Sequence, residues 1–373
     1  MRIVFVCSSL LTTTGGIETT VASLARELSA RHSVVVLAGR GPDTLRIGKG
    51  VEVFALPFLN RESRIGVTLR RNVPRYDPFF FESLTLNTAL ARSFAARRTL
   101  SNADVVSFHS KYDCMFLSRR FASWGIPSVF HVQGAKFGRT FQSLSRVSRY
   151  VAVSETTRRD LSLRFGLPFT ATVTPGIPDK LLEMPRVEED VVLFVGRLQP
   201  SKGTVEAIQV FHEVSRPFPN LRLVVIGDGP GRSQMEAEAR ERGVADRVSF
   251  LGSVPQEEVF RHYAKAKIVL FPSRVETYPL VPLEAMAAGC PVIAYNIPGV
   301  LESTGGHVAL VEPGNHAALA NAATDLLRDR GRRAELSSAG RSWAANHTWS
   351  NSSRLYLREL EEAARGRLGN PLS

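Results

Sequence analysis

The chain has little cysteine, and this scarcity excludes several classes of protein. Its 373 residues include three widely separated cysteines, Cys7, Cys114 and Cys290, and no Cys-x-x-Cys pair. A disulfide scaffold and a zinc or dithiol motif are therefore not indicated, and buried thiols in a reducing cytoplasm are the simplest interpretation. No apolar run approaches the roughly 18 residues that span a bilayer. No convincing small-residue cleavage site follows the apolar N-terminus, so we interpret it as a first strand.

Two ligand-binding motifs are also missing. The sequence contains no Gly-x-Gly-x-x-Gly, so a nicotinamide cofactor is not indicated. It contains no Asp-x-Asp, so a metal ion bridging a diphosphate is not implied. We therefore expect neither a cofactor nor a metal site.

Acidic residues are scarce in the first half of the chain. Residues 1–180 hold 25 Lys and Arg against 12 Asp and Glu, whereas the remainder is nearly neutral. Basic residues cluster at 61–64, 70–75 and 92–98, together with the aromatic residues at 79–81. Such a surface could meet an anionic membrane, an anionic acceptor or a nucleic acid, or it could serve only for solubility.

The hydrophobic pattern predicts two α/β domains, as the chain length also favours. In the first half, helical patterning separates strands expected at 3–6, 34–37, 105–108, 128–132 and 150–153. In the second half, strands are expected at 191–195, 223–226, 248–251, 268–271 and 292–294. Two doubly wound, Rossmann-like parallel sheets would face each other across a cleft, because such sheets bind ligands at the carboxyl ends of their strands.

The domain boundaries follow from composition. We place the first domain at 1–175, a proline-rich linker at 176–190 and the second domain at 191–345. A C-terminal helix is expected within 346–373 and could pack back on the first domain.

The most informative segment is 273–294, which carries two carboxylates eight positions apart, Glu276 and Glu284. Pro279 and Pro282 predict that a helix begins between these carboxylates, because proline is tolerated in the first turn. Unpaired N–H groups at this helix start would favour a phosphate. Hydroxyl-seeking carboxylates beside a phosphate site indicate a pocket for a sugar nucleotide.

Other candidate residues follow predicted strands. Arg197 and Lys202 lie between a strand and a helix, where two cations suit a diphosphate. The Gly15-Gly16 pair in the first strand–helix turn would allow close approach of a ligand, or would only turn the chain. His131 ends a predicted strand and precedes Lys136; a lone histidine is usually structural, and His109 competes for the same role.

Taken together, these motifs resemble the retaining glycosyltransferases of family 4, which have the GT-B fold. The resemblance rests on the E-x7-E element, on Gly196-Arg-Leu with Lys202-Gly203, and on segments 225–230 and 248–252 in the family's order. The first half matches more loosely, through Gly15-Gly-Ile-Glu18, His131 with Lys136, and Val153-Ser154.

The resemblance implies a role for each matching residue. It implies that His131 and Glu276 are catalytic, that Glu276, Thr277 and His131 contact the donor sugar, and that Glu284 binds the ribose. For the donor diphosphate it implies Gly16, Arg197, Lys202, Tyr278, Pro279 and Leu280. We assign Gly15 and Lys136, and His109 from its place after a predicted strand, to the acceptor side.

Three departures from the family pattern leave the donor undetermined. Thr277-Tyr-Pro279 replaces the common Gly-Phe-Gly, Pro175-Gly176 replaces Asn-Gly, and Pro298-Gly299 replaces a Gly-Gly ahead of Glu302. None of these changes removes a charged group.

The motifs and the resemblance together thus predict metal-independent transfer of a sugar from a nucleoside diphosphate to a sugar, lipid-linked or other hydroxyl acceptor. Retention of configuration is implied by the resemblance alone. The expected setting is cytoplasmic, with a peripheral position on the inner membrane face as an option, in cell-envelope, polysaccharide, glycolipid or secondary-metabolite synthesis. A sugar-nucleotide epimerase of the same architecture and a basic nucleic-acid-binding protein are the alternatives.

Overall fold

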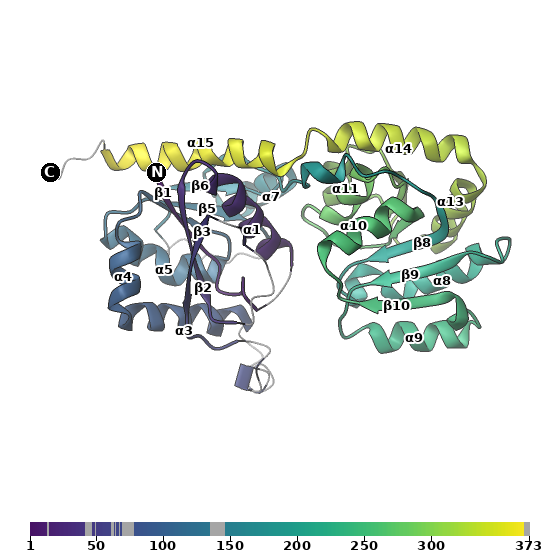
Figure 1. Ribbon diagram of the computed structural model, residues 1–373, viewed down its shortest axis with the longest axis horizontal. Helices are drawn as coiled ribbons and strands as arrows, with labels where there is room; N and C mark the ends of the chain where they lie inside the picture. Colours follow the sequence, from purple (N-terminus) through teal and green to yellow (C-terminus); the bar gives the residue numbers. More distant parts are fainter. Residues whose placement is uncertain are drawn as a thin grey trace. The chain divides into compact units, whose positions relative to one another are not determined.

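A computed structural model describes residues 1–12, 15–41, 47–48, 50–60, 63, 65–66, 68, 78–134 and 146–368. The chain forms two compact units (Figure 1). Unit 1 comprises Met1–Thr174 together with Trp349–Ser373, and unit 2 comprises Pro175–Thr348. The segment 176–190, which its composition predicts as a linker, thus belongs to unit 2.

Unit 1 is built on a parallel seven-stranded sheet with strand order β3-β2-β1-β4-β5-β6-β7. Its strands are β1 Arg2–Val6, β2 Ser33–Gly39, β3 Val51–Leu56, β4 Val105–Phe108, β5 Ser128–Val132, β6 Arg149–Ala152 and β7 Phe169–Thr172. The central strands are runs of buried apolar residues, as expected for parallel strands covered on both faces. The predicted α/β class is confirmed here.

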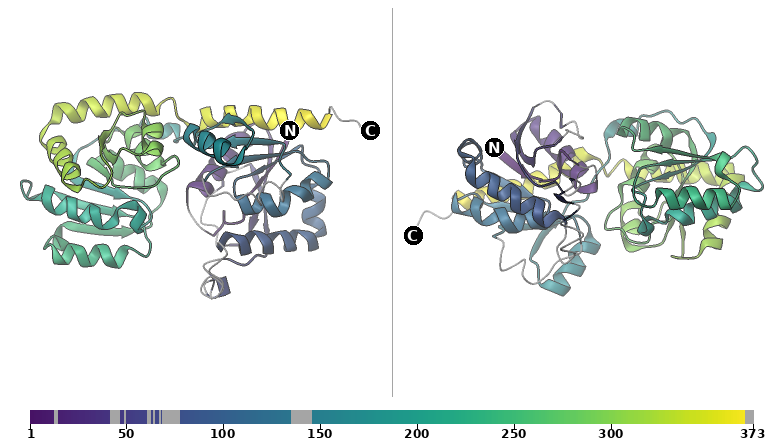
Figure 2. Two further views of the ribbon diagram at one scale, coloured as in Figure 1. Left: turned by 180° about the vertical axis from the view of Figure 1, so that it is seen from behind. Right: turned by 90° about the horizontal axis from the view of Figure 1, so that it is seen from below.

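Helices cover both faces of this sheet. They are α1 Gly16–Ser29, α3 Pro78–Arg92, α4 Phe94–Leu100, α5 Lys111–Ser123, α7 Glu155–Phe165 and α15 Trp349–Leu368. The last helix, α15, packs against α1 and against strands β4, β5 and β6. Figure 2 shows it lying along unit 1 from two further directions. The C-terminal helix therefore completes the unit that begins at the N-terminus.

Unit 2 is built on a parallel six-stranded sheet with strand order β10-β9-β8-β11-β12-β13. Its strands are β8 Glu189–Val195, β9 Arg222–Ile226, β10 Val248–Gly252, β11 Ala266–Phe271, β12 Val292–Tyr295 and β13 Ala309–Val311. Its α-helices are α8 Thr204–Ser215, α9 Arg232–Glu241, α10 Gln256–Lys265, α11 Leu280–Ala287, α12 Pro298–Thr304, α13 His316–Arg328 and α14 Arg330–Ala344. Short 3-10 turns occur at η1 Asp179–Leu181, η2 Pro200–Lys202 and η3 Ala245–Arg247.

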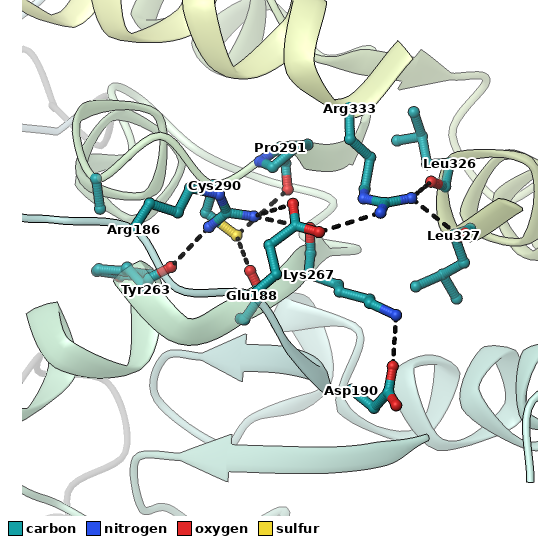
Figure 3. A network of polar contacts seen from close by, with 12 residues as sticks. Arg186, Glu188, Asp190, Tyr263, Lys267, Cys290, Pro291, Leu326, Leu327 and Arg333 are labelled. Atoms are coloured by element: carbon teal, nitrogen blue, oxygen red, sulfur yellow. Dashed lines mark hydrogen bonds and ion pairs between the residues drawn. The ribbon is translucent and has the colours of Figure 1, made fainter. Parts of the chain in front are cut away.

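Ion pairs fix the segment before β8 to unit 2. Arg186 pairs with Glu188 at 3.1 Å and donates to the carbonyls of Tyr263 and Lys267, each at 3.3 Å. Glu188 also pairs with the buried Arg333 of α14 at 3.1 Å (Figure 3). The end of the expected linker is consequently anchored by both ion pairs and backbone contacts.

Candidate functional site

The loops that follow β8 and β11 meet at the carboxyl ends of these neighbouring strands. Gly203, at the end of the first loop, has φ +67°, and a Cβ there would lie 2.3 Å from the carbonyl oxygen of Pro272. The Arg274 N–H donates to the carbonyl of Ser201 at 3.0 Å. Glycine at position 203 thus permits a close approach that a larger residue would prevent.

This approach joins two predicted site residues. The Lys202 ammonium lies 2.5 Å from Oε1 of Glu276, and the Ser273 hydroxyl donates to the same oxygen at 2.7 Å. Both charged side chains are partly buried. The cation expected to bind a diphosphate and the carboxylate expected to bind a sugar are therefore direct neighbours.

The start of α12 supports the loop that carries Glu276. A Cβ on Gly299 would lie 2.4 Å from the Glu276 carbonyl oxygen and 3.0 Å from that of Thr277. Pro298-Gly299 stands where the family pattern has Gly-Gly. The second glycine, which this chain keeps, is the one against which the loop backbone packs.

The helix α11 begins at Leu280, immediately after Pro279, which confirms the helix start expected between the two carboxylates. A helix leaves the N–H groups of its first turn without intrahelical partners. In α11, Leu280 and Val281 carry such groups, whereas Pro282 has none. Tyr278 and Pro279, just before the helix, are buried.

Glu284 is buried in α11 and is held by α10. The Tyr263 hydroxyl donates to one carboxylate oxygen at 3.2 Å, and the Gln256 amide donates to the other at 3.4 Å. Burial raises the pKa of Glu284 to about 7, although both hydrogen bonds act in the opposite direction. The carboxylate therefore titrates close to neutral pH.

Arg197 is exposed on the loop after β8. Among the described residues, no ion pair or hydrogen bond joins its side chain to Lys202, Glu276 or Glu284. The structure thus brings Lys202 and Glu276 into direct contact, whereas no such contact joins Arg197 to them among the described residues.

A cluster that sequence analysis missed lies beside these loops. The buried carboxylate of Glu206 accepts from Arg274 at 2.8 Å and from the Tyr295 hydroxyl at 2.9 Å, and His316 Nε2 lies 3.2 Å away. Arg274, Glu206 and His316 contribute to the lining of a cavity of about 350 Å³. Because these residues are distant in sequence, no local spacing could indicate the cluster.

In unit 1, the two candidate histidines lie together beside α15. His131 is 1% exposed; its Nε2 donates to the carbonyl of Val173 at 2.8 Å, so Nδ1 is the acceptor for the Gln133 amide at 3.1 Å. Burial lowers the pKa of His131 to about 4, so the ring is neutral at pH 7. The direct contact between His131 and the donor sugar stays a prediction.

His109 lies in the same buried network. Its Nε2 is 2.9 Å from the Ser107 hydroxyl, which lies 2.7 Å from the Tyr356 hydroxyl of α15. Its ring centroid is 5.3 Å from that of His131. Gln133, the first residue beyond β5, reaches His131 and makes a long contact of 3.5 Å with His109. The sequence analysis did not single out Gln133, although its position directly after a predicted strand could have indicated it.

The remaining candidates of unit 1, Gly15 and Lys136 for the acceptor and Gly16 for the donor diphosphate, are only partly described. Gly15 precedes α1, and Gly16 is its exposed first residue, where a Cβ would meet no atom within 4 Å. Lys136 lies outside the described residues. Within the described ranges, no cluster of three or more His, Cys, Asp or Glu side chains is arranged to hold a metal ion. Across those ranges, no helix has the length and apolar character needed to span a bilayer.

Comparisons with known proteins cover both units. The family model described as glycosyl transferases group 1 matches residues 183–343, and that of glycosyltransferase family 4 matches residues 14–180.

Curated relatives match either most of the chain or about half of it. A GDP-mannose-dependent alpha-(1-6)-phosphatidylinositol monomannoside mannosyltransferase of Mycolicibacterium smegmatis is 28% identical over 89% of this chain and 91% of its own. The 2-deoxystreptamine glucosyltransferase of Streptomyces kanamyceticus is 33% identical over 48% of each chain, so this match spans about half of that relative.

Solved structures match the fold along nearly the whole chain. Sucrose-phosphate synthase from Thermosynechococcus elongatus aligns with a TM-score of 0.77 at 19% identity, over 98% of this chain and 99% of its own. Anabaena HepE, solved in complex with UDP-glucose, aligns with a TM-score of 0.76 at 18% identity, over 97% and 100%. Each of the two parallel-sheet units matches one of the two family models, and the chain belongs to glycosyltransferase family 4 and has the GT-B fold.

Proposed function

We propose that this protein transfers a sugar from a nucleoside-diphosphate sugar to an acceptor hydroxyl with retention of anomeric configuration. The observation that carries the proposal is the contact of Lys202 with Glu276 beside the start of α11. In such a donor the sugar is bonded directly to the diphosphate. Adjacent ammonium and carboxylate groups can therefore bind the diphosphate and the sugar hydroxyls at the same time.

The chemical difficulty is the negative charge that grows on the departing nucleoside diphosphate. Prepositioned cations and N–H groups stabilise such charge without reorganising. We assign this role to Lys202, to Arg197 and to the first-turn N–H groups of α11. In the free protein, Glu276 neutralises Lys202; the donor diphosphate would take over the ammonium and leave the carboxylate to accept sugar hydroxyls.

The other roles extend from this centre. Glu284 would accept hydrogen bonds from the ribose hydroxyls, for which its ionised form is required. We assign Gly16 to the donor phosphate, and His131, with Gln133 at the strand end, to the donor sugar. Retention would follow if the acceptor attacks on the leaving-group face and the departing phosphate takes its proton, so no protein nucleophile is assigned.

We propose that the reaction is metal-independent and cytoplasmic. Curated relatives include enzymes named for phosphatidylinositol monomannoside and for 2-deoxystreptamine. By analogy, we propose a hexosyl donor and a sugar, lipid-linked or other hydroxyl acceptor, in glycolipid, envelope polysaccharide or secondary-metabolite glycoside synthesis.

The test is a thermal-shift screen of UDP, GDP and ADP and of their sugars, with and without EDTA, because a ligand that binds only the native state raises its apparent stability. A stabilising nucleotide sugar is then incubated with candidate acceptors, and the anomeric configuration of the product is read by NMR. A product of inverted configuration would refute retention. Formation of an isomeric sugar nucleotide without any acceptor would favour an epimerase, and the absence of any nucleotide effect would overturn the proposal.

A further inference from the structure

The corner between α3 and α4 exposes apolar and basic side chains that the donor site does not use. We call this the α3–α4 surface, formed by Ala91, Arg92, Phe94, Ala95, Arg97 and Arg98, all of them exposed. Phe94 is 78% exposed, although phenylalanine is usually buried. An exposed aromatic beside several cations suggests an interaction surface.

The geometry of α4 places these side chains together. Residues three and four apart share one face of a helix, so Phe94 lies on the same face as Arg97 and Arg98. The opposite face holds Ala96 and Leu100, which are fully buried. The Ser93 hydroxyl caps the helix by accepting from the Ala96 N–H at 3.2 Å. The core thus fixes α4 with Phe94 and both arginines outward.

Within the part of the chain that the structure describes, the arginines of this surface have no acidic partner. Residues 83–103 contain no Asp or Glu. Among the described residues, Arg92, Arg97 and Arg98 form no ion pair. A further cation, Arg120 of α5, lies near Arg97. Burial, and then the like charge of Arg97, lower the pKa of Arg120.

A second exposed apolar residue in unit 1 provides a contrast. Leu163 of α7 is 87% exposed and also lies among arginines. There Arg158 and Arg159 pair with Glu155 at 2.7 and 3.0 Å, and Arg164 pairs with Asp160 at 3.0 Å. Each of these α7 arginines is thus paired with a carboxylate of its own helix, whereas those of the α3–α4 surface are not.

We propose that the α3–α4 surface docks on a bilayer containing anionic lipid, with Phe94 inserted between headgroups and Arg92, Arg97 and Arg98 on the lipid phosphates. Interfacial helices of this kind combine an apolar residue with flanking cations. A protruding helix corner fits a planar membrane better than a single nucleic-acid strand, which is typically bound in a charged groove. The inference identifies the contact surface for the predicted membrane association and does not depend on the sugar chemistry.

The experiment is co-sedimentation of the full chain with vesicles of phosphatidylcholine alone or with phosphatidylglycerol added. We expect binding to the anionic vesicles only. Phe94→Ser should lower the partition coefficient roughly tenfold, from the loss of its buried apolar area. The double variant Arg97→Gln/Arg98→Gln should lower it about 25-fold, or about fivefold for each arginine.

Matched variants on α7 serve as controls. Leu163→Ser, like Phe94→Ser, replaces an exposed apolar side chain with a serine, and Arg158→Gln/Arg159→Gln changes the net charge by the same amount as the α4 double variant. For these α7 variants we expect a partition coefficient within about twofold of the parent's, because charges beyond a Debye length are largely screened. Thermal unfolding confirms that each variant is folded. Equal effects of the α4 and α7 changes, or equal binding to both vesicle types, would overturn the proposal.

Two further measurements separate the possible failures. If Arg97 and Arg98 were required for binding an oligonucleotide while no vesicle binding occurred, the surface would be a nucleic-acid site and the membrane proposal would be wrong. Vesicle binding is measured without a sugar nucleotide, and sugar transfer without vesicles. A protein that binds anionic vesicles but transfers no sugar would thus refute the proposed function and leave this inference intact.

Discussion

At the scale of single residues, the site in unit 2 balances opposite charges before any ligand binds. Lys202 and Glu276 lie 2.5 Å apart, and the Ser273 hydroxyl shares the same carboxylate oxygen. In the proposed donor complex, the diphosphate would compete with this carboxylate for the ammonium. Each charged residue would then influence binding of the ligand group assigned to the other.

Replacing Glu276 should separate sugar transfer from nucleotide binding. In Glu276→Gln we expect turnover to fall by at least 100-fold, because a preorganised contact to the reacting sugar is lost. Affinity for the nucleoside diphosphate should rise, because Lys202 loses its internal partner. Calorimetric titration and product assays measure the two effects, and Glu276→Asp is the conservative control. A variant with parental turnover would exclude Glu276 from the donor-sugar role.

Glu284 should make nucleotide affinity depend on pH near neutrality. Its pKa of about 7 means that the carboxylate becomes protonated as the pH falls below neutral, and the protonated form accepts hydroxyl groups less well. We expect nucleotide affinity to fall by roughly tenfold from pH 8 to pH 6. Titrations with Glu284→Gln should show a flatter profile; an equally steep profile in that variant would assign the dependence to another group.

The same carboxylate should reduce stability above neutral pH. A Glu with a pKa raised in the folded state favours folding below its unfolded-state pKa, and this contribution is lost as pH rises through about 7. Glu284→Gln should therefore stabilise unit 2 relative to the parent at pH 8, by about 3 kcal/mol at most, and by less at pH 5. Denaturant unfolding at the two pH values measures this difference. An identical effect of the substitution at both values would contradict the assigned pKa.

At the scale of secondary-structure elements, burial decides what the sequence could predict. The inner strands of both sheets are apolar runs and were predicted with small errors at their ends. Three of the four edge strands, β3, β7 and β13, contain half-exposed residues that break the run, and they were missed. The fourth, β10, is also half-exposed but was predicted at 248–251. A continuous apolar pattern arises only where helices cover both faces of the sheet.

The same distinction applies to the site. Lys202, Glu276 and Glu284 follow strand ends or a helix start and were found from local spacing. Glu206 and its contact with Arg274 were not, because the two residues are 68 positions apart and only the folded loops join them. Tertiary contacts of this kind leave no periodicity in the sequence.

Helix α15 should contribute stability through one buried hydroxyl. The Tyr356 hydroxyl lies 2.7 Å from that of Ser107, within the network that includes His109. Tyr356→Phe should destabilise unit 1 by about 1 kcal/mol, because one buried hydrogen bond is lost while Ser107 keeps its contact with His109. Chemical denaturation measures the change, and Leu355→Ala, on the exposed side of α15, is the control. Equal stability of Tyr356→Phe and the parent would show that the network is dispensable.

At the scale of the whole molecule, the two units differ in how the chain builds them. Unit 2 is one continuous segment, Pro175–Thr348, and its ends meet where Ile177 bridges Thr348 and donates to the carbonyl of His347 at 2.9 Å. Unit 1 combines the first 174 residues with α15. The units should therefore respond differently when separated.

We expect residues 175–348, produced alone, to fold cooperatively and to bind the nucleoside diphosphate, since every proposed nucleotide-binding residue except Gly16 lies within them. Residues 1–174 alone should show lower stability, because removing α15 exposes β4, β5 and β6 on one face. Circular dichroism during heating, with and without nucleotide, tests both fragments. Failure of the 175–348 fragment to fold would show that unit 2 depends on unit 1.

The return of α15 to the first sheet has a consequence for biosynthesis. A ribosome releases the last residues of unit 1 only after all of unit 2 has been made, so the later unit is free to fold while the earlier one still waits for its final helix. During that interval, the uncovered apolar side of the nascent N-terminal sheet would be open to chaperones. Deleting α15 would thus damage a unit whose other elements are all made much earlier.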